Sequence, residues 1–356
     1  MKALILLGGL GTRLKPLTSF SPKPLLPILN RPFIGYQLDL LKKYGVREVV
    51  LALGHQAAHF RRALGDGRRW GVRLTYSLEK EPLGTGGAIR LALPHLSGPA
   101  YILNGDVLSD FDLGQLAAVH RHRKADATVV LVEVDDPSHF GLVETDREGT
   151  VRRFLEKPSG GKSPVRTVNA GCYLFSPKVV ERIPSGRAVS IEREIFPALL
   201  SEKFKVVSFL HRGYWSDIGT LSRYWRTHRD LHERGQWPKG LKLRKGLRLE
   251  KGVVVGKSPK VLGTAVIGEG AWVGDHVEFE GHVTLGARTR IESSVRLSDC
   301  VILEGVRIGS HTRVEKSIIG PQSVVGSHCF VGPNQVLGSG ARLPSHSQVF
   351  PGLMST

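Results

Sequence analysis

The chain has 356 residues, and because a single hydrophobic core rarely grows beyond about 250–300 residues, two domains are expected. It carries 50 Lys and Arg against 32 Asp and Glu, yet the basic residues are scattered and no nucleic-acid module is recognisable, which argues against a nucleic-acid partner. No apolar stretch reaches the roughly 18 residues that a membrane span needs, and three widely separated cysteines form no disulfide framework, so a cytoplasmic location is expected.

Short apolar runs alternate with helix-length amphipathic segments up to about residue 228. The expected strands are 4–7, 48–53, 72–77, 100–103 and 127–134, and the expected helices are 34–43, 56–64, 87–93 and 113–122. This alternation predicts an α/β fold with a Rossmann-like, mostly parallel sheet and helices on both faces. Ligands of such sheets bind beyond the carboxyl ends of the strands.

A different period begins after a polar, basic linker at 229–248. One aliphatic or aromatic residue then recurs about every six positions, with glycine often directly after it. The series is Val255, Val261, Ile267, Val273, Phe279, Leu285, Ile291, Leu297, Ile302, Ile308, Val314, Ile319, Val325 and Val331. This pattern is typical of hexapeptide repeats and resembles the left-handed parallel β-helix family. We therefore predict a catalytic domain at 1–228 and a β-helix at 249–350, in which glycine permits the tight corners.

The first expected strand runs into the loop Gly8-Gly9-Leu10-Gly11-Thr12-Arg13-Leu14. Leu14 occupies the third glycine position of a Rossmann turn, and no Walker A loop occurs in the chain. What remains is a loop whose bare backbone N–H groups can approach phosphate oxygens. Arg13 supplies a planar fork for the same oxygens, and Lys23, between two prolines, adds a second cation.

At these residues the chain resembles the NDP-sugar pyrophosphorylase (sugar-1-phosphate nucleotidyltransferase) family, whose signature G-G-x-G-T-R-L-x-P-L-T and P-K-P stands here at 8–18 and 22–24. Further family motifs follow in order: Glu81-Pro82-Leu83-Gly84-Thr85-Gly86, Asn104-Gly105-Asp106, Phe140-Gly141, Phe154-Leu155-Glu156-Lys157-Pro158, Val168-Asn169-Ala170-Gly171 and Trp215-Ser216-Asp217-Ile218-Gly219. The resemblance covers the whole chain, because many members carry a hexapeptide β-helix after the catalytic domain.

The resemblance implies transfer of a nucleotidyl group from a nucleoside triphosphate to a sugar 1-phosphate. Its catalytic residues here would be Arg13, Lys23, Asp106, Lys157 and Asp217, with Asp106 and Asp217 holding Mg²⁺. The nucleotide site would comprise Leu7, Gly8, Gly9, Gly11, Thr12, Arg13, Glu79, Pro82, Gly84 and Thr85, and the sugar-phosphate site Gly141, Glu156, Lys157, Asn169 and Gly171. The residue types suit this reaction, since joining two anionic phosphates needs cations and a metal rather than a general base.

Each of these residues, taken singly, has an ordinary structural alternative. Asp106 could form a turn, Asp217 could cap a helix, and Glu156-Lys157 could be a surface ion pair. Acyl transfer by a β-helix histidine is a minor alternative. A regulatory subunit without activity is another, although such a member should have lost the cations and carboxylates that this chain retains.

The nucleobase is predicted from Glu79, which by its spacing to Pro82 stands where uridylyl and thymidylyl relatives carry glutamine. A carboxylate only accepts hydrogen bonds, and guanine presents two adjacent donors, so Glu79 favours GTP unless it only pairs with Lys80 at the surface. The segment Ser190-Ile191-Glu192-Arg193-Glu194 also resembles the corresponding segment of mannose-1-phosphate guanylyltransferases. We expect GTP and mannose 1-phosphate as substrates, with glucose-1-phosphate thymidylyl or uridylyl transfer as the alternative, and a homo-oligomer assembled through the β-helix.

Overall fold

The computed structural model describes residues 1–356 except 10, 55, 157–164, 239, 245 and 351–356, and the side chain of Glu156 is also not described. The chain forms two compact units, Met1–Gly9 with Ile34–Asp217, and Leu10–Phe33 with Ile218–Thr356. The domain boundaries predicted from sequence stay predictions. Within the described residues, no helix has the length and apolar character needed to cross a bilayer.

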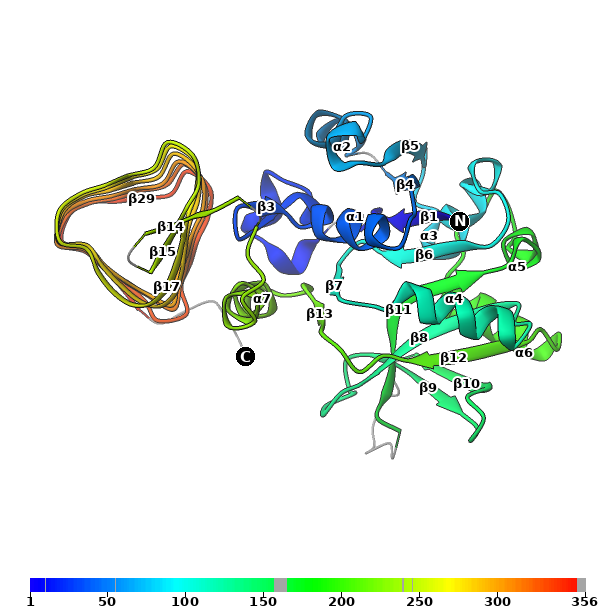
Figure 1. The fold of residues 1–356 in the computed structure, drawn as a ribbon. Coiled ribbons are helices and arrows are strands. Elements are labelled where there is room, and N and C mark those ends of the chain that lie inside the picture. Colours follow the sequence, from blue (N-terminus) through cyan, green and yellow to red (C-terminus); the bar gives the residue numbers. More distant parts are fainter. Residues whose placement is uncertain (10, 55, 157–164, 239, 245, 351–356) are drawn as a thin grey trace. The chain divides into compact units, whose positions relative to one another are not determined.

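The first unit is built on a mixed, mostly parallel sheet in the order β10-β9-β11-β6-β1-β4-β5, with β8 on β11 and β12 on β8 (Figure 1). The strands of this unit are β1 (Lys2–Leu6), β4 (Glu48–Leu53), β5 (Arg73–Leu78), β6 (Ala100–Asn104), β7 (Val107–Ser109), β8 (Ala127–Glu133), β9 (Gly141–Thr145), β10 (Val151–Glu156), β11 (Thr167–Phe175), β12 (Val206–Leu210) and β13 (Trp215–Asp217). Of these, β7 and β13 form a separate two-stranded sheet. The α-helices of the unit are α1 (Ile34–Lys43), α2 (Ala57–Leu64), α3 (Gly84–Leu91), α4 (Leu113–His122), α5 (Pro177–Arg182) and α6 (Phe196–Ser201). The predicted fold class is confirmed.

The two faces of this sheet are covered by different helices, as the alternation of side chains in β6 illustrates. Ala100 and Ile102 belong to a buried cluster that includes side chains of α3, α5 and α6. Tyr101 points to the opposite face, where its hydroxyl donates a hydrogen bond to the carbonyl of Leu113 in α4 at 2.7 Å. β1, β4, β5 and β6 run parallel, so their carboxyl ends lie along one edge of the sheet.

The second unit contains a parallel β-helix, α7 (Leu221–Glu233) and the short hairpin β2 (Pro27–Ile28) with β3 (Arg31–Pro32). One strand column is β15 (Leu247–Leu249), β17 (Lys260–Ile267), β19 (Glu278–Leu285), β21 (Arg296–Ser298), β24 (Arg313–Glu315), β27 (Phe330–Val331) and β30 (Gln348–Val349), with β14 (Lys242–Arg244) antiparallel at its edge. Beside it run β22 (Val301–Ile302), β25 (Ile318–Ile319) and β28 (Val336–Leu337). Another column is β16 (Val254–Val255), β18 (Trp272–Val273), β20 (Arg290–Ile291), β23 (Arg307–Ile308), β26 (Val324–Val325) and β29 (Arg342–Leu343).

The predicted inward positions of the repeat are confirmed as the core of this unit. All fourteen belong to one hydrophobic cluster, with Val255 and Val261 partly buried and the others buried. Phe279 stacks between Val261 and Leu297 at a spacing of 18 residues, and the five-residue step after Leu297 shortens the next coil, so that Leu297 pairs with Val314. Each buried aliphatic side chain stabilises the coil by roughly 1.5–3 kcal/mol.

The glycines of the repeat have a different role from the predicted one. A Cβ on Gly268 would lie 2.5 Å from the backbone nitrogen of Ala287 in the next coil, and Gly286 and Gly309 have equally close neighbours. The left-handed backbone of the corners is carried mainly by other residues, such as His311, with φ 59°. Glycine is therefore required for the close approach of neighbouring coils rather than for the turn itself.

The segment from Gly11 to Lys23, which carries most of the predicted phosphate loop, packs on α7 and the β-helix within the second unit. The tip of the β2–β3 hairpin is buried at Leu29, and Asn30 Nδ2 donates a hydrogen bond to the carbonyl of Leu285 at 2.8 Å. His228 Nε2 donates to the carbonyl of Pro27 at 3.1 Å. The β-helix therefore forms part of the support for this segment.

Two buried histidines of α7 are expected to make the stability of this unit depend on pH. Burial lowers the pKa of His228 to about 3, and burial together with the nearby His228 and His282 lowers the pKa of His232 to about 3. His228 Nδ1 accepts from the backbone N–H of Leu29 at 3.5 Å while Nε2 donates, so the folded state holds the neutral ring.

Because the unfolded chain protonates histidine near pH 6.5 and the folded unit resists protonation, this contribution to stability is complete above pH 6.5 and is lost as the pH falls towards 3. We expect the Tm of the wild type to fall between pH 7 and pH 4. The Tm of His228→Gln should be lower at pH 7 and should fall less steeply over the same range. His122→Gln, at an exposed site of α4, serves as the control and should leave the slope unchanged. An unchanged slope in His228→Gln would contradict the assignment.

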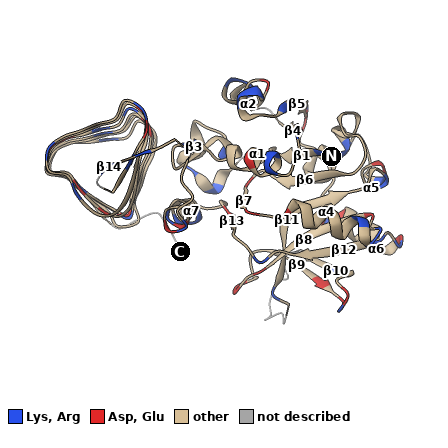
Figure 2. Ribbon diagram, viewed as in Figure 1, with Lys and Arg blue, Asp and Glu red and all other residues tan. Residues whose placement is uncertain are grey.

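Basic residues are spread over both units. Figure 2 shows Lys and Arg on α1, α2, α5 and α7 as well as on the coils of the β-helix. Many of them pair with acidic neighbours along the repeat, as Arg296 does with Glu278 at 2.8 Å. Such pairs are worth little individually, but they show that much of the positive charge is locally compensated.

Candidate functional site

The Asn104-Gly105-Asp106 turn lies at the carboxyl end of β6. A Cβ on Gly105 would come within 2.5 Å of the carbonyl oxygen of Leu6, so glycine is needed for the close approach to β1. Gln37 of α1 donates hydrogen bonds from Nε2 to the carbonyls of Asn104 at 2.8 Å and Val107 at 3.0 Å. Both ends of the turn are therefore fixed, which orients the backbone that carries Asp106.

A two-stranded ladder brings Asp217 next to this turn. β13 runs antiparallel to β7, and in their register Asp217 stands opposite Val107, the residue after Asp106. Asp217 ends a strand, and the cap of the following helix is Thr220, whose hydroxyl accepts from the N–H of Arg223 at 3.3 Å. The helix-cap alternative for Asp217 is therefore wrong, and two carboxylates far apart in sequence are neighbours in the fold.

A bulge in β11 brings the predicted sugar residues Asn169 and Gly171 to the same region. The ladder with β8 shifts register between Asn169 and Tyr173, and Gly171 adopts φ 72°. Asn169 Oδ1 accepts from the N–H of Gly171 at 3.0 Å, which holds the bulge. A Cβ on Gly171 would lie 2.8 Å from Asn104 Nδ2, so the bulge packs directly against the turn at the end of β6.

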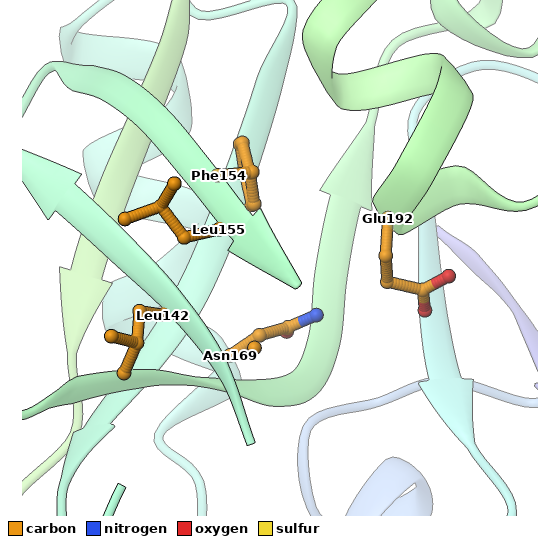
Figure 3. Close-up of a pocket in the computed structure, with 6 residues that line it drawn as sticks. Leu142, Phe154, Leu155, Asn169 and Glu192 are labelled. Carbon is orange, nitrogen blue, oxygen red and sulfur yellow. The ribbon is translucent and has the colours of Figure 1, made fainter. Parts of the chain in front are cut away.

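The remaining predicted sugar residues lie on the neighbouring hairpin. Gly141 begins β9, and its register partner on β10 is Glu156. Gly141 and Asn169 line one pocket together with Leu142, Phe154, Leu155 and Glu192 (Figure 3). Two of the predicted sugar residues, Gly141 and Asn169, therefore line one pocket, while Lys157 lies outside the described residues.

Glu79 follows β5 and lies beside Gly8, the first glycine of the predicted phosphate loop. A Cβ on Gly8 would be 3.4 Å from Glu79 Oε1, and Glu79 Oε2 accepts from the backbone N–H of Leu83 at 2.9 Å. Glu79 is partly buried and Lys80 is exposed, with no ion pair between them among the described residues. The surface-pair alternative for Glu79 is therefore wrong, and the carboxylate keeps one oxygen directed towards the loop.

The 82–85 loop is tied to the segment after α5. A Cβ on Gly84, where φ is 66°, would lie 2.6 Å from the carbonyl oxygen of Val189. The Thr85 hydroxyl accepts from the N–H of Ile191 at 2.9 Å and donates to Glu192 at 3.0 Å. The hydroxyl is thus engaged within the protein, and Pro82 is exposed.

The predicted triphosphate-binding cations lie on the segment 10–33 of the second unit. Gly11, with φ 62°, opens a short 3₁₀ turn over Thr12–Leu14, where Thr12 and Arg13 are exposed. Thr18 donates its hydroxyl to the carbonyl of Gly11 at 2.8 Å, and a Cβ on Gly11 would lie 3.2 Å from the Cβ of Lys23. These contacts hold the arginine turn and the lysine turn side by side within this segment.

The family model described as Nucleotidyl transferase matches residues 2–234, and the model described as GMPPB C-terminal domain matches residues 242–350. The mannose-1-phosphate guanylyltransferase of Mycobacterium tuberculosis is 40% identical over 304 residues, which cover 84% of this chain and 82% of that protein. The chain belongs to the nucleotidyl transferase family.

Two further proteins are similar to this nucleotidyltransferase. The mannose-1-phosphate guanylyltransferase catalytic subunit beta of Xenopus tropicalis is 35% identical over 338 residues, which cover 92% of this chain and 88% of that protein. The crystal structure of HddC from Yersinia pseudotuberculosis complexed with GMP-PN has a TM-score of 0.56 and 29% identity, and the match covers 65% of this chain and 99% of HddC.

Glu192 is a pocket residue that the sequence analysis did not assign to the site. It lies in a π-helical turn over Ile191–Ile195, about twenty residues beyond the nearest predicted sugar residue. Single-turn π segments often occur at functional sites, but nothing in the local sequence distinguishes this turn from an ordinary helix start.

Proposed function

We propose that this nucleotidyltransferase is a mannose-1-phosphate guanylyltransferase, which converts GTP and mannose 1-phosphate into GDP-mannose and pyrophosphate. The observation that carries the proposal is the likeness to relatives of that name over most of both chains, at 35–40% identity. The position of the Glu79 carboxylate beside Gly8 supports guanine as the base.

In the proposed reaction a phosphate oxygen of mannose 1-phosphate attacks the α-phosphorus of GTP. The new oxygen–phosphorus bond forms as the bond to the β-phosphate oxygen breaks, and pyrophosphate leaves with the electron pair. The nucleophile is already an anion, so the protein's task is to position two charged groups and neutralise them. Arg13 and Lys23 would bind the triphosphate, and Lys157 would hold the sugar phosphate.

Mg²⁺ fits the oxygen ligands on the β6 and β13 side of the first unit. Magnesium is bound in proteins by one or two carboxylates, completed by phosphate oxygens and water, and Asp106 and Asp217 stand one register position apart. Asn104 Oδ1, at the start of the same turn, is buried and accepts no hydrogen bond from the described residues. When bound, Mg²⁺ would neutralise charge on the phosphates.

The proposal is tested by measuring pyrophosphate release from five nucleoside triphosphates with mannose or glucose 1-phosphate. We expect GTP with mannose 1-phosphate to give the highest kcat/KM. A preference for UTP or dTTP, or for glucose 1-phosphate, would favour the thymidylyl or uridylyl alternative. Absence of turnover with every pair would favour a regulatory subunit.

Changing Glu79 to Gln tests the basis of the nucleotide preference. Glutamine offers one acceptor and one donor, so it no longer matches the two adjacent donors of guanine and instead matches the acceptor–donor edge of uracil. We expect kcat/KM for GTP to fall about 10- to 100-fold and the UTP-to-GTP ratio to rise. Glu81→Gln, at an exposed position two residues away, is the control. Equal losses in both variants would contradict the role of Glu79.

We also propose that the protein is a cytoplasmic homo-oligomer. The β-helix exposes apolar side chains, with Leu262 56% and Val254 54% exposed, which a second subunit could cover. Sedimentation of the full chain, compared with Leu262→Lys, tests this, and a wild-type protein that sediments as a monomer would contradict it.

A further inference from the structure

Glu192 lies in the pocket that contains Gly141 and Asn169 (Figure 3). The pocket is lined by the apolar side chains of Leu142, Phe154 and Leu155, and Asn169 and Glu192 are the polar side chains among the described residues that line it. Placing a carboxylate beside apolar side chains costs free energy unless the carboxylate is hydrogen-bonded. The hydrogen-bond partners of Glu192 therefore bear on its role.

The glutamate is held through one oxygen only. Oε2 accepts hydrogen bonds from the hydroxyls of Ser190 at 2.8 Å and Thr85 at 3.0 Å. Oε1 accepts no hydrogen bond from the residues that the structure describes, and Glu192 lines the same pocket as Asn169. The two hydroxyls therefore orient the carboxylate and leave one oxygen available to a ligand.

The neighbouring glutamate of the same turn is arranged differently. Glu194 accepts from Arg187 Nη1 at 2.8 Å and from the backbone N–H of Ser190 at 3.0 Å, and it does not line the pocket. The π-helical turn thus directs one carboxylate to an arginine and the other into the pocket. Glu194 provides a matched control for Glu192.

Asn169 faces the pocket with an orientation that is also fixed. Its Nδ2 donates to the hydroxyl of Tyr173 at 2.7 Å, and its Oδ1 accepts from the N–H of Gly171 at 3.0 Å. Burial raises the pKa of Tyr173 well above its ordinary value, and the negative charge of Glu192 adds to the rise, so Tyr173 stays a neutral phenol. No described residue accepts a hydrogen bond from the second Nδ2–H of the amide, which leaves this N–H as a donor in the pocket that Glu192 also lines.

We propose that Glu192 is a sugar-binding and specificity-determining residue, whose Oε1 accepts a hydrogen bond from one ring hydroxyl of the hexose 1-phosphate. A fixed acceptor and a fixed amide beside apolar side chains suit a hexose, which presents hydroxyl donors around a ring with apolar C–H groups. A site built to bind a hydroxyl rejects an analogue that lacks it, because the buried acceptor is then left unpaired. This inference rests on the proposed function for the substrate class.

The first test compares Glu192→Ala with Glu194→Ala in the full-length protein. We expect KM for mannose 1-phosphate to rise about 10- to 100-fold in Glu192→Ala, the loss typical of a hydrogen bond to a charged group, with KM for GTP changed less than about threefold. Glu194→Ala should leave both constants near wild type. An equal rise in KM for GTP would overturn the proposal, because Glu192 would then act through Thr85 on the 82–85 loop.

The second test identifies the hydroxyl with the 2-, 3-, 4- and 6-deoxy forms of mannose 1-phosphate. One analogue should be penalised in the wild type and carry no further penalty in Glu192→Ala, since both changes remove the same hydrogen bond. Independent penalties for every analogue would overturn the proposal. Glu192→Gln, which preserves the volume, should show the same pattern more weakly and replaces Glu192→Ala if that variant does not fold.

These outcomes separate the inference from the proposed function. If the wild type prefers another sugar 1-phosphate, the assignment to mannose fails. Comparing deoxy forms of the preferred sugar in the wild type and in Glu192→Ala still tests the role of Glu192. If the wild type uses mannose 1-phosphate but the penalties of the deoxy analogues are the same in the wild type and in Glu192→Ala, the sugar-binding role of Glu192 is excluded and the proposed function stands.

Discussion

Asp106→Asn should abolish metal-dependent pyrophosphate release while leaving the protein folded. The substitution keeps the size and turn chemistry of the side chain but removes one of the two carboxylates proposed for Mg²⁺. Because a bound metal supplies several kcal/mol of charge stabilisation, we expect kcat/KM to fall by about 10³-fold or more. The measurement is pyrophosphate release as a function of Mg²⁺ concentration, with the Tm as the test of folding.

The control for this prediction is Asp112→Asn, six residues along the chain. Asp112 caps α4, where its Oδ1 accepts from the N–H of Gln115 at 2.9 Å, and asparagine caps a helix equally well. Activity and Tm should therefore stay near wild type. Unchanged turnover in Asp106→Asn would show that this residue only forms the turn, which is the structural alternative considered for it.

Lys23→Ala should lower kcat/KM by about 10²- to 10³-fold, the loss seen when one group that stabilises transition-state charge is removed. Lys23 starts a 3₁₀ turn, Lys23–Leu25, and is partly buried next to Gly11. Its position is thus fixed in the same segment as Arg13. The measurement is the steady-state rate with GTP and mannose 1-phosphate, together with the Tm.

Lys15→Ala is the matched control for this lysine, because Lys15 lies on the same segment and is exposed. It removes the same charge and should change kcat/KM less than about threefold. Equal losses in the two variants would mean that the segment contributes only a general positive field. Salt dependence would then be the same for both, whereas a direct contact from Lys23 predicts a loss that persists at high salt.

The β-helix supports the segment that carries Arg13 and Lys23, so changes in the β-helix are expected to affect the reaction. Asn30 donates to the carbonyl of Leu285, and the Tyr224 hydroxyl and His228 hold the carbonyl of Pro27. The segment that carries Arg13 and Lys23 is thus packed on the C-terminal elements of its own unit. Substitutions in these contacts are expected to displace Arg13 and Lys23, the residues proposed to bind the triphosphate, without changing either residue itself.

Much of the fold was predictable because its signals are local and periodic. The helices at 34–43 and 113–122 and the strand at 48–53 coincide with α1, α4 and β4. The fourteen phased residues of the repeat all joined one core, since stacking coils at a fixed spacing needs only one inward position per turn. The role of the glycines was not predictable, because it depends on the distance between successive coils.

The candidate site was predictable in its residues but not in its assembly. The motifs named Asp106, Asp217 and Asn169, and the backbone positions that carry them come close together because β13 pairs with β7 and because β11 bulges against Asn104. Lys157 lies outside the described residues, so its predicted role stays a prediction. The same holds for the Mg²⁺ site and for the nucleotide contacts of Thr12 and Pro82.

The sequence by itself determined the reaction class, the two architectures and the chemically active residue types, because motif spacing and hydrophobic period are carried by neighbours along the chain. Only the tertiary structure decided that Glu79 lies beside Gly8 and that Glu192 lines the same pocket as Asn169. These pairs are separated by seventy-one and twenty-three residues, respectively. Their proximity follows from strand order, a bulge and a π-helical turn, which no local pattern specifies.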